Sequence, residues 1–201
     1  RLYNNLKPKF DNVRTPKVYW DVTTSKILTL EFIEGVKVND LKGLKSLDAD
    51  PATIAELLCE VFSTQIFLQG LVHCDPHPGN VFVRRNPNTW NNALELVILD
   101  HGLYHEIDDE FRYSYCKLWK SIINRDEEGM KLVARELGVN SYELFAVMLT
   151  SRSWDLDDIG FKSSHKLTKD DLKKIQQYGM DNFFNMTQVL SGVNRKMLLL
   201  L

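Results

Sequence analysis

Residues 73–80 read HCDPHPGN, which puts two histidines, a thiol, an acid, two prolines, a glycine and an amide into eight positions. Pro76 and Pro78 each fix φ and remove a backbone donor, so the segment can form neither a helix nor a strand. We therefore expect a stiff loop. A stiff loop holds its polar side chains in set positions, as a chemical site requires.

The segments on either side of this loop have clear patterns. Asp50 followed by Pro51 predicts a helix start, apolar residues recur on one stripe as far as Leu68, and Gly70 is suited to end the helix. This predicts a buried core helix over residues 51–69. Beyond the loop, VFVRR and ALELVIL predict two short strands joined by a turn, over residues 81–85 and 93–99.

This pair of strands predicts which polar side chains meet. Antiparallel strands joined by a turn bring their outer ends together, so Asn80 and Asp100 are expected side by side, with Asp75 one loop away. Carboxylate and amide oxygens are hard donors that suit Mg²⁺. The spacing H-x-D-x-x-x-x-N, followed at a strand end by D-x-G, is the arrangement of the catalytic and metal-binding loops of protein kinases. Gly102 would allow the sharp turn after the metal ligand.

Other interpretations of these residues remain. His73 is expected to be a structural histidine bonded to the backbone, and Cys74 a packed, idle thiol. A two-metal hydrolase could use imidazole and carboxylate ligands, here drawn from His73, Asp75, His77, His101 and His105. The prolines flanking His77 and the otherwise unused Asn80 disfavour it. A catalytically silent scaffold is the other alternative, disfavoured because all three oxygen donors are intact.

The rest of the chain is predicted to be a small β element followed by helices. KVYWDV and KILTLEFI predict a hairpin over 17–22 and 26–33, and a loop with a short helix follows over 34–50. Helical patterns follow within 111–123, 127–138, 141–154 and 170–190. The acids Asp155, Asp157 and Asp158 are expected on a solvated loop.

Composition excludes several classes of protein. The 201 residues are 44% hydrophobic and 26% charged, which is a globular composition. A net charge of −2 gives no electrostatic reason to expect nucleic acid as a partner. The three cysteines have no CxxC spacing, so reduced thiols are expected rather than a disulfide framework or a zinc site.

The motifs HCDPHPGN and LDHGLY resemble the UbiB-like atypical kinases, the aarF-domain-containing proteins. The resemblance runs from about Trp20 to Trp154, and the DHG form resembles a mitochondrial branch of the family. It implies an α+β, protein-kinase-like fold, mainly the helical C-lobe with the hinge and a few N-lobe strands. Residues 1–33 would be the end of the N-lobe and residues 34–201 the C-lobe.

The resemblance also implies roles at the loop. Asp75 would be the catalytic acid, and His77, in the place of the usual kinase lysine, would approach the transferred phosphate as a second catalytic residue. Asn80 and Asp100 would bind Mg²⁺ and, through it, the nucleotide.

A second matching motif is LEFIEG, which resembles the kinase hinge. Leu30 would be the gatekeeper, and the backbone carbonyl of Glu31 and the backbone N–H of Ile33 would face adenine. The cofactors implied are ATP and Mg²⁺.

Some family parts do not occur in the chain. It contains no glycine-rich or alanine-rich phosphate loop, no KxGQ element and no activation segment ending in A-P-E. The chain thus resembles the hinge and C-lobe of a longer polypeptide, and activity of this part alone is not expected. The implied function is an atypical kinase or ATPase in mitochondrial lipid, quinone or membrane homeostasis. Expected partners are ATP, the missing N-lobe and a lipid or mitochondrial inner-membrane surface, with no nucleic acid. A phosphotransferase resembling aminoglycoside or choline kinases is a further alternative.

Overall fold

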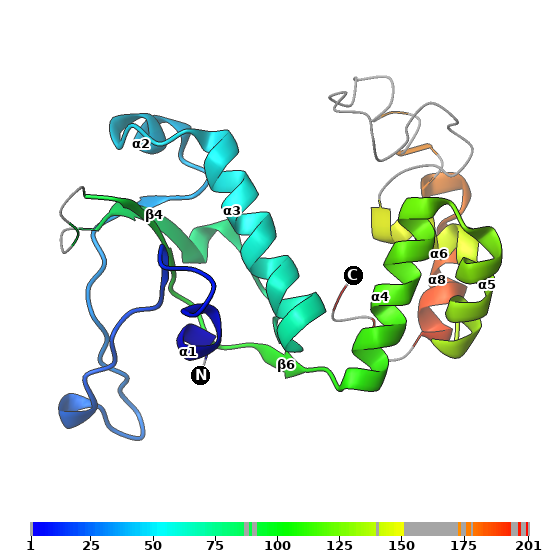
Figure 1. Ribbon diagram of the computed structural model, residues 1–201, viewed down its shortest axis with the longest axis horizontal. Helices are drawn as coiled ribbons and strands as arrows, with labels where there is room; N and C mark the ends of the chain where they lie inside the picture. Colours follow the sequence, from blue (N-terminus) through cyan, green and yellow to red (C-terminus); the bar gives the residue numbers. More distant parts are fainter. Residues whose placement is uncertain are drawn as a thin grey trace. The chain divides into compact units, whose positions relative to one another are not determined.

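The computed structural model describes residues 2–86, 89, 92–139, 141–150, 173, 176–177, 179–193, 197 and 200 (Figure 1). The chain divides into two compact units, Arg1–Glu106 and Ile107–Leu201. This division falls inside the predicted C-lobe and leaves the predicted lobe boundary at residue 33 untested.

The first unit contains two small sheets. One has the strand order β1-β5-β4-β2, in which β1 runs parallel to β5 and the other neighbours are antiparallel. The second sheet pairs β3 with β6 in antiparallel register. The strands are β1 Val13–Arg14, β2 Val36–Lys37, β3 Leu71–His73, β4 Val81–Arg85, β5 Leu94–Ile98 and β6 Tyr104–Glu106. The two predicted strands are therefore confirmed as β4 and β5, and the four shorter ones were not predicted.

The two faces of the β4–β5 pair are filled differently. Because side chains alternate along a strand, Val81, Val83, Leu96 and Ile98 share one face, and all four are buried in the main core. Helices α1 Leu2–Leu6, α2 Leu41–Ser46 and α3 Pro51–Thr64 contribute to the same core. The opposite face carries the cross-strand pair Arg84 and Glu95, which the sequence reading did not single out.

Helix α3 starts and stops as predicted. The Asp50 carboxylate accepts from the backbone N–H groups of Ala52 and Thr53, which caps the start. The helix continues into a π-helical turn, η2 Gln65–Gln69, and Gly70 ends it at a φ of 66°, in the left-handed region. Leu68 is 62% exposed, so the predicted burial fails at this end because the π turn rotates the last residues off the helical stripe.

The combined stretch Pro51–Gln69 is long and apolar enough, by length and composition, to cross a membrane. Core helices of soluble proteins can be as long and as apolar; Ile54 and Val61 of this helix lie in the core, and 22% of the apolar stretch is buried.

The predicted hairpin over 17–33 forms only in part. A single antiparallel bridge joins Val18 to Leu30. The Tyr19 N–H donates to the Thr29 carbonyl at 2.9 Å. Short turns, among them the 3₁₀ turn η1 Trp20–Val22, replace regular strands.

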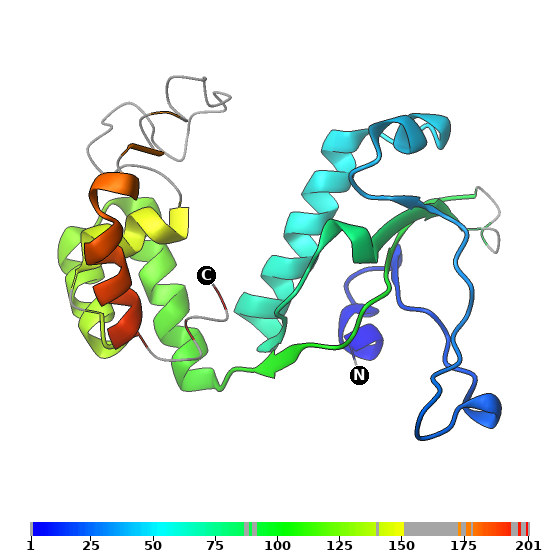
Figure 2. The ribbon, with the colours of Figure 1, turned by 180° about the vertical axis from the view of Figure 1, so that it is seen from behind.

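Helices make up the described part of the second unit (Figure 2). They are α4 Asp109–Asn124, α5 Glu127–Glu136, α6 Tyr142–Thr150 and α8 Phe183–Gly192. The carboxylates of Asp108 and Asp126 cap α4 and α5 by accepting from backbone N–H groups. The predicted helices are confirmed in the described residues, and the acids at 155–158 lie outside them.

Candidate active site

The loop over 73–80 is held by bonds within itself. Strand β3 delivers His73 in a buried position, and the 3₁₀ turn η3 Pro78–Asn80 ends the loop. The His77 N–H donates to the Asp75 carbonyl at 2.8 Å, and the Asn80 N–H donates to the His77 carbonyl at 2.9 Å. The His77 ring accepts the Gly79 N–H at Nδ1, 3.0 Å away. A neutral His77 therefore carries its proton on Nε2, on an exposed side chain.

The predicted meeting of Asn80 and Asp100 is confirmed. Val81 pairs with Ile98, and the Leu99 N–H donates to the Asn80 carbonyl at 2.8 Å, so the strand ends lie together. The Asn80 amide Nδ2 donates to Asp100 Oδ2 at 3.1 Å. The contact brings an amide and a carboxylate together, and the oxygens of both groups are hard donors of the kind that Mg²⁺ prefers.

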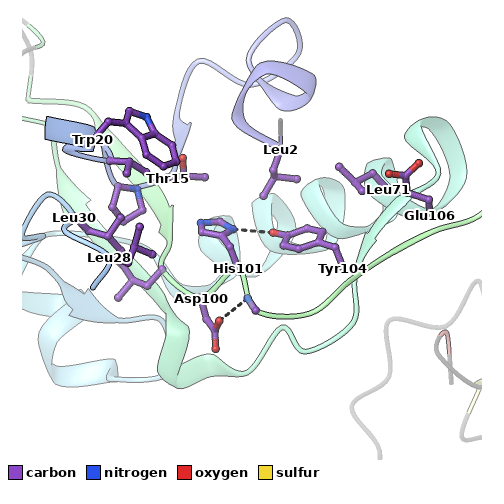
Figure 3. A pocket seen from close by; sticks show the side chains of 14 residues that line it. Leu2, Thr15, Trp20, Leu28, Leu30, Leu71, Asp100, His101, Tyr104 and Glu106 are labelled. Carbon is purple, nitrogen blue, oxygen red and sulfur yellow. Dashed lines mark hydrogen bonds between the residues drawn. The ribbon is translucent and has the colours of Figure 1, made fainter. Parts of the chain in front are cut away.

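The second oxygen of Asp100 is used by the turn that follows. The Gly102 N–H donates to Asp100 Oδ1 at 2.8 Å (Figure 3). A Cβ at position 102 would lie 3.1 Å from that oxygen, so any larger residue would crowd the carboxylate. Glycine follows the acid at this spacing because of that close approach.

His73 connects Asp75 to Asp100 through the backbone. Its ring is 4% exposed; Nδ1 accepts the Asp75 N–H at 3.1 Å, and Nε2 lies 3.0 Å from the Asp100 carbonyl. A carbonyl only accepts, so Nε2 carries the proton. The expectation of a structural, backbone-bonded histidine is thus confirmed. The Asp75 side chain itself is exposed and, in the described residues, makes no direct bond to Asn80 or Asp100.

The charge at this site comes from its acids. Burial lowers the pKa of both His73 and His101. Nearby backbone carbonyls and the charge of Asp100 act in the opposite direction but have a smaller effect on each pKa. Both rings are therefore neutral at neutral pH, and neither compensates the carboxylates. The donor set and the uncompensated negative charge together fit a hard divalent cation.

Burial raises the pKa of the Cys74 thiol, which stays protonated at neutral pH. Its Sγ lies 3.6 Å from the Val72 carbonyl. This agrees with the expected idle thiol.

The predicted hinge residues lie beside a buried ion pair that sequence reasoning missed. Arg84 Nε lies 2.6 Å from Glu95 Oε1, and the Arg84 guanidinium also lies 3.5 Å from Glu31 Oε1. The other Glu31 carboxylate oxygen accepts the Lys17 N–H at 3.2 Å. Ile33 is 8% exposed, and its N–H makes no hydrogen bond within the described residues. Opposite charges at inward positions of two apolar strands were the available signal for this pair.

A cavity of about 730 Å³ lies next to the DHG turn, in the first unit (Figure 3). Its walls include Trp20, Leu28, Leu30 and His101. Two residues with predicted roles line it, Asp100 of the metal site and Leu30, the predicted gatekeeper. The cavity therefore borders the Asn80–Asp100 contact on the side of Asp100.

The two-metal hydrolase has no support in this geometry. Among the described residues, no group of three or more His, Cys, Asp or Glu side chains is placed to hold a metal. The Nε2 atoms of His73 and His101 each face a backbone carbonyl instead.

Comparison with known proteins identifies relatives of this chain. AarF domain-containing protein kinase 1 from Xenopus laevis is 38% identical over 199 residues, 98% of this chain and 38% of that protein. "Probable serine/threonine-protein kinase abkD" of Dictyostelium discoideum is 32% identical over 191 residues, 95% of this chain and 27% of that protein. The chain thus spans 38% or less of the length of these curated relatives.

A solved structure shares the fold. The Rv3197–erythromycin complex from Mycobacterium tuberculosis matches with a TM-score of 0.55 at 20% identity, covering 87% of this chain and 43% of that one. This likeness concerns the fold alone. The ABC1 atypical kinase-like domain matches residues 2–134, which is more than half of the chain. The sequence resemblance and the kinase-like α+β fold are confirmed, and the chain belongs to the ABC1, or aarF-domain-containing, family of atypical kinase-like proteins.

Proposed function

We propose that this chain is the hinge and C-lobe part of a Mg²⁺-dependent, ATP-binding atypical kinase or ATPase. The observation that carries the proposal is the contact of the Asn80 amide with the Asp100 carboxylate, at 3.1 Å, beside two neutral histidines. When bound, Mg²⁺ would neutralise charge on nucleotide phosphates, and Asn80 and Asp100 are the side chains that would hold it.

The loop residues have separate tasks in this proposal. Asp75 is exposed and without a side-chain partner in the described residues, so it is free to accept a proton from a hydroxyl or water. His77 directs an Nε2–H outward from the same loop and can donate to a phosphate oxygen. An imidazole at this position, when neutral, would offset less charge than the lysine of ordinary kinases.

Adenine would lie against the backbone of residues 31–33. The N–H of Ile33 is unpaired in the described part of the chain and is suited to donate to a purine nitrogen, with the Glu31 carbonyl as the acceptor. The Glu31 side chain, between Arg84 and the Lys17 N–H, would keep this stretch of backbone in place.

The proposed partner of the 17–33 hairpin is the N-lobe of the same polypeptide. Trp20 is 73% exposed and Phe32 is 85% exposed, and large exposed apolar surface is typical of a site where another part of a protein packs. For the full-length protein we propose a role at mitochondrial membranes, in lipid, quinone or membrane homeostasis. This part rests on the family resemblance, and the chain alone is expected to turn over ATP negligibly.

The test is Asp100→Asn in the full-length polypeptide. The substitution keeps the shape of the side chain and removes its charge, so the fold should persist while Mg·ATP binding is lost. At a ligand concentration a hundred times Kd, wild type should gain about 2.7 kcal/mol of stability in a thermal-shift titration, and the variant close to none. Asp11→Asn changes an exposed acid outside the site and is the matched control.

Each outcome selects one interpretation. An unchanged shift in Asp100→Asn would contradict the metal role. Binding of Mg·ATP without phosphate release, with or without mitochondrial lipids, would favour the silent scaffold. Transfer of phosphate to a small-molecule hydroxyl in place of water or lipid would favour the aminoglycoside- or choline-kinase-like alternative.

A further inference from the structure

The turn between β5 and β6 is spanned by one histidine ring. His101 Nε2 lies 3.0 Å from the Ile98 carbonyl, and Nδ1 lies 3.0 Å from the Tyr104 hydroxyl (Figure 3). The carbonyl can only accept, so Nε2 carries the proton of the neutral ring. Nδ1 is then bare, and the Tyr104 hydroxyl must be the donor. Both bonds can form with a neutral ring only in this tautomer.

Tyr104 also contacts the second histidine of the site. Its ring stacks on His101 with a centroid separation of 5.9 Å and an interplanar angle of 17°. The same ring lies 4.9 Å from that of His73, its partner in the β3–β6 register. His73 in turn donates to the Asp100 carbonyl. Tyr104 therefore touches both rings that are bonded to the backbone around Asp100.

Packing alone does not hold the His101 ring. The ring borders the cavity of about 730 Å³, whose other walls include the apolar side chains Trp20, Leu28 and Leu30 (Figure 3). A side chain beside that much space can change rotamer at little steric cost, so the two hydrogen bonds carry the orientation. The Tyr104 hydroxyl is one of the two.

We propose that Tyr104 is a positioning residue that, through His101, holds the Asp100–Gly102 turn so that the Asp100 carboxylate faces Asn80. The turn determines where Asp100 points, because Gly102 binds one carboxylate oxygen at 2.8 Å and Asn80 the other at 3.1 Å. Rotation of the His101 backbone would move both. The inference rests on the proposed Mg²⁺ role of Asp100, and it assigns to the hydroxyl of Tyr104 a task beyond packing.

A double-mutant cycle tests this coupling in the full-length polypeptide. Tyr104→Phe keeps the stacking on both histidines and removes only the hydroxyl. We expect the Mg²⁺ concentration for half-maximal ATP turnover to rise roughly three- to tenfold, the range for loss of one hydrogen bond. In a His101→Phe background, which has no ring nitrogen to orient, Tyr104→Phe should change that concentration less than twofold. Tyr19→Phe removes a hydroxyl from the 17–33 hairpin and is the matched control.

A second readout does not depend on activity. In ¹⁵N spectra of the histidine side chains of the wild-type chain, His101 should carry its proton on Nε2 with Nδ1 bare, and Tyr104→Phe should produce a mixture of tautomers. A proton on Nδ1 of wild-type His101, or the same tautomer in both proteins, would overturn the proposal. So would equal effects of Tyr104→Phe on Mg²⁺ dependence in the two backgrounds, or a lower melting temperature with unchanged Mg²⁺ dependence. If the wild-type protein binds no Mg·ATP, the proposed function fails, and the spectra still decide whether Tyr104 orients His101.

Discussion

Two segments of the first unit were both predicted to be hairpins, and their structures are very different. Residues 81–98 form a ladder of five cross-strand pairs between β4 and β5, with Val83 and Leu96 fully buried. Residues 17–33 are richer in β-branched and aromatic residues, with ten in 17 against seven in 18, yet they make one bridge and leave Phe32 85% exposed. Strand-forming residues thus make a continuous ladder only where the side chains on both faces of the strands pack against other parts of the protein.

The second face of the ladder sharpens this comparison. On the face away from the main core, Arg84 and Glu95 are paired at 2.6 Å, with side chains only 10% and 1% exposed. A charged pair this buried depends on both members, because each would otherwise be an uncompensated charge in a poorly solvated site. The 17–33 hairpin contacts this pair through Glu31, whose Oε1 lies 3.5 Å from the Arg84 guanidinium.

The largest expected effect follows from breaking that pair. Glu95→Ala should lower the free energy of unfolding by about 3–5 kcal/mol, because Arg84 keeps its charge and retains only the 3.5 Å contact with Glu31. Chemical denaturation of the variant and wild-type chains measures the difference. Replacing both members with apolar residues, Arg84→Met together with Glu95→Leu, should be close to neutral. A loss below about 1 kcal/mol for Glu95→Ala would show that the pair is solvated in practice.

The same substitution in both hairpins compares them directly. Leu96→Ala removes a fully buried side chain and should cost about 2–5 kcal/mol. Leu28→Ala, at a site 61% exposed, should stay within about 0.5 kcal/mol. Equal losses at the two positions, measured by the same denaturation experiment, would mean that the 17–33 hairpin is as well packed as the ladder.

Sequence reasoning succeeded where the signal was local. The start of α3 depends on Asp50 and Pro51, which are neighbours, and its end depends on one glycine at position 70. The meeting of Asn80 and Asp100 depends on the register of a single hairpin, so two strand predictions sufficed to place them together. These contacts need no knowledge of distant segments.

Sequence reasoning failed where two contacting residues are far apart in the sequence. Strands β1 and β2 have two residues each and exist only because β5 and β4 pair with them. Two residues carry no periodicity to detect. The Arg84–Glu31 contact joins residues 53 positions apart, and the task proposed for Tyr104 requires the β3–β6 pairing that brings it to His73. Such contacts are determined by tertiary packing, and a local sequence pattern cannot predict them.

The smallest expected effect is at the most exposed apolar residue of the 17–33 hairpin. Phe32→Ser should change the free energy of unfolding of this chain by no more than about 0.5 kcal/mol, because the ring is 85% exposed and has little burial to lose. It should also reduce binding of an apolar dye such as ANS, since that ring is part of the exposed apolar surface. In the full-length polypeptide the proposed N-lobe would cover the ring, and the same substitution should then cost several times more, on the scale of a buried aromatic side chain. If Phe32→Ser changes the free energy of unfolding by nearly zero in both proteins, no N-lobe packs on this hairpin. The hairpin would then be exposed in the full-length folded protein as well.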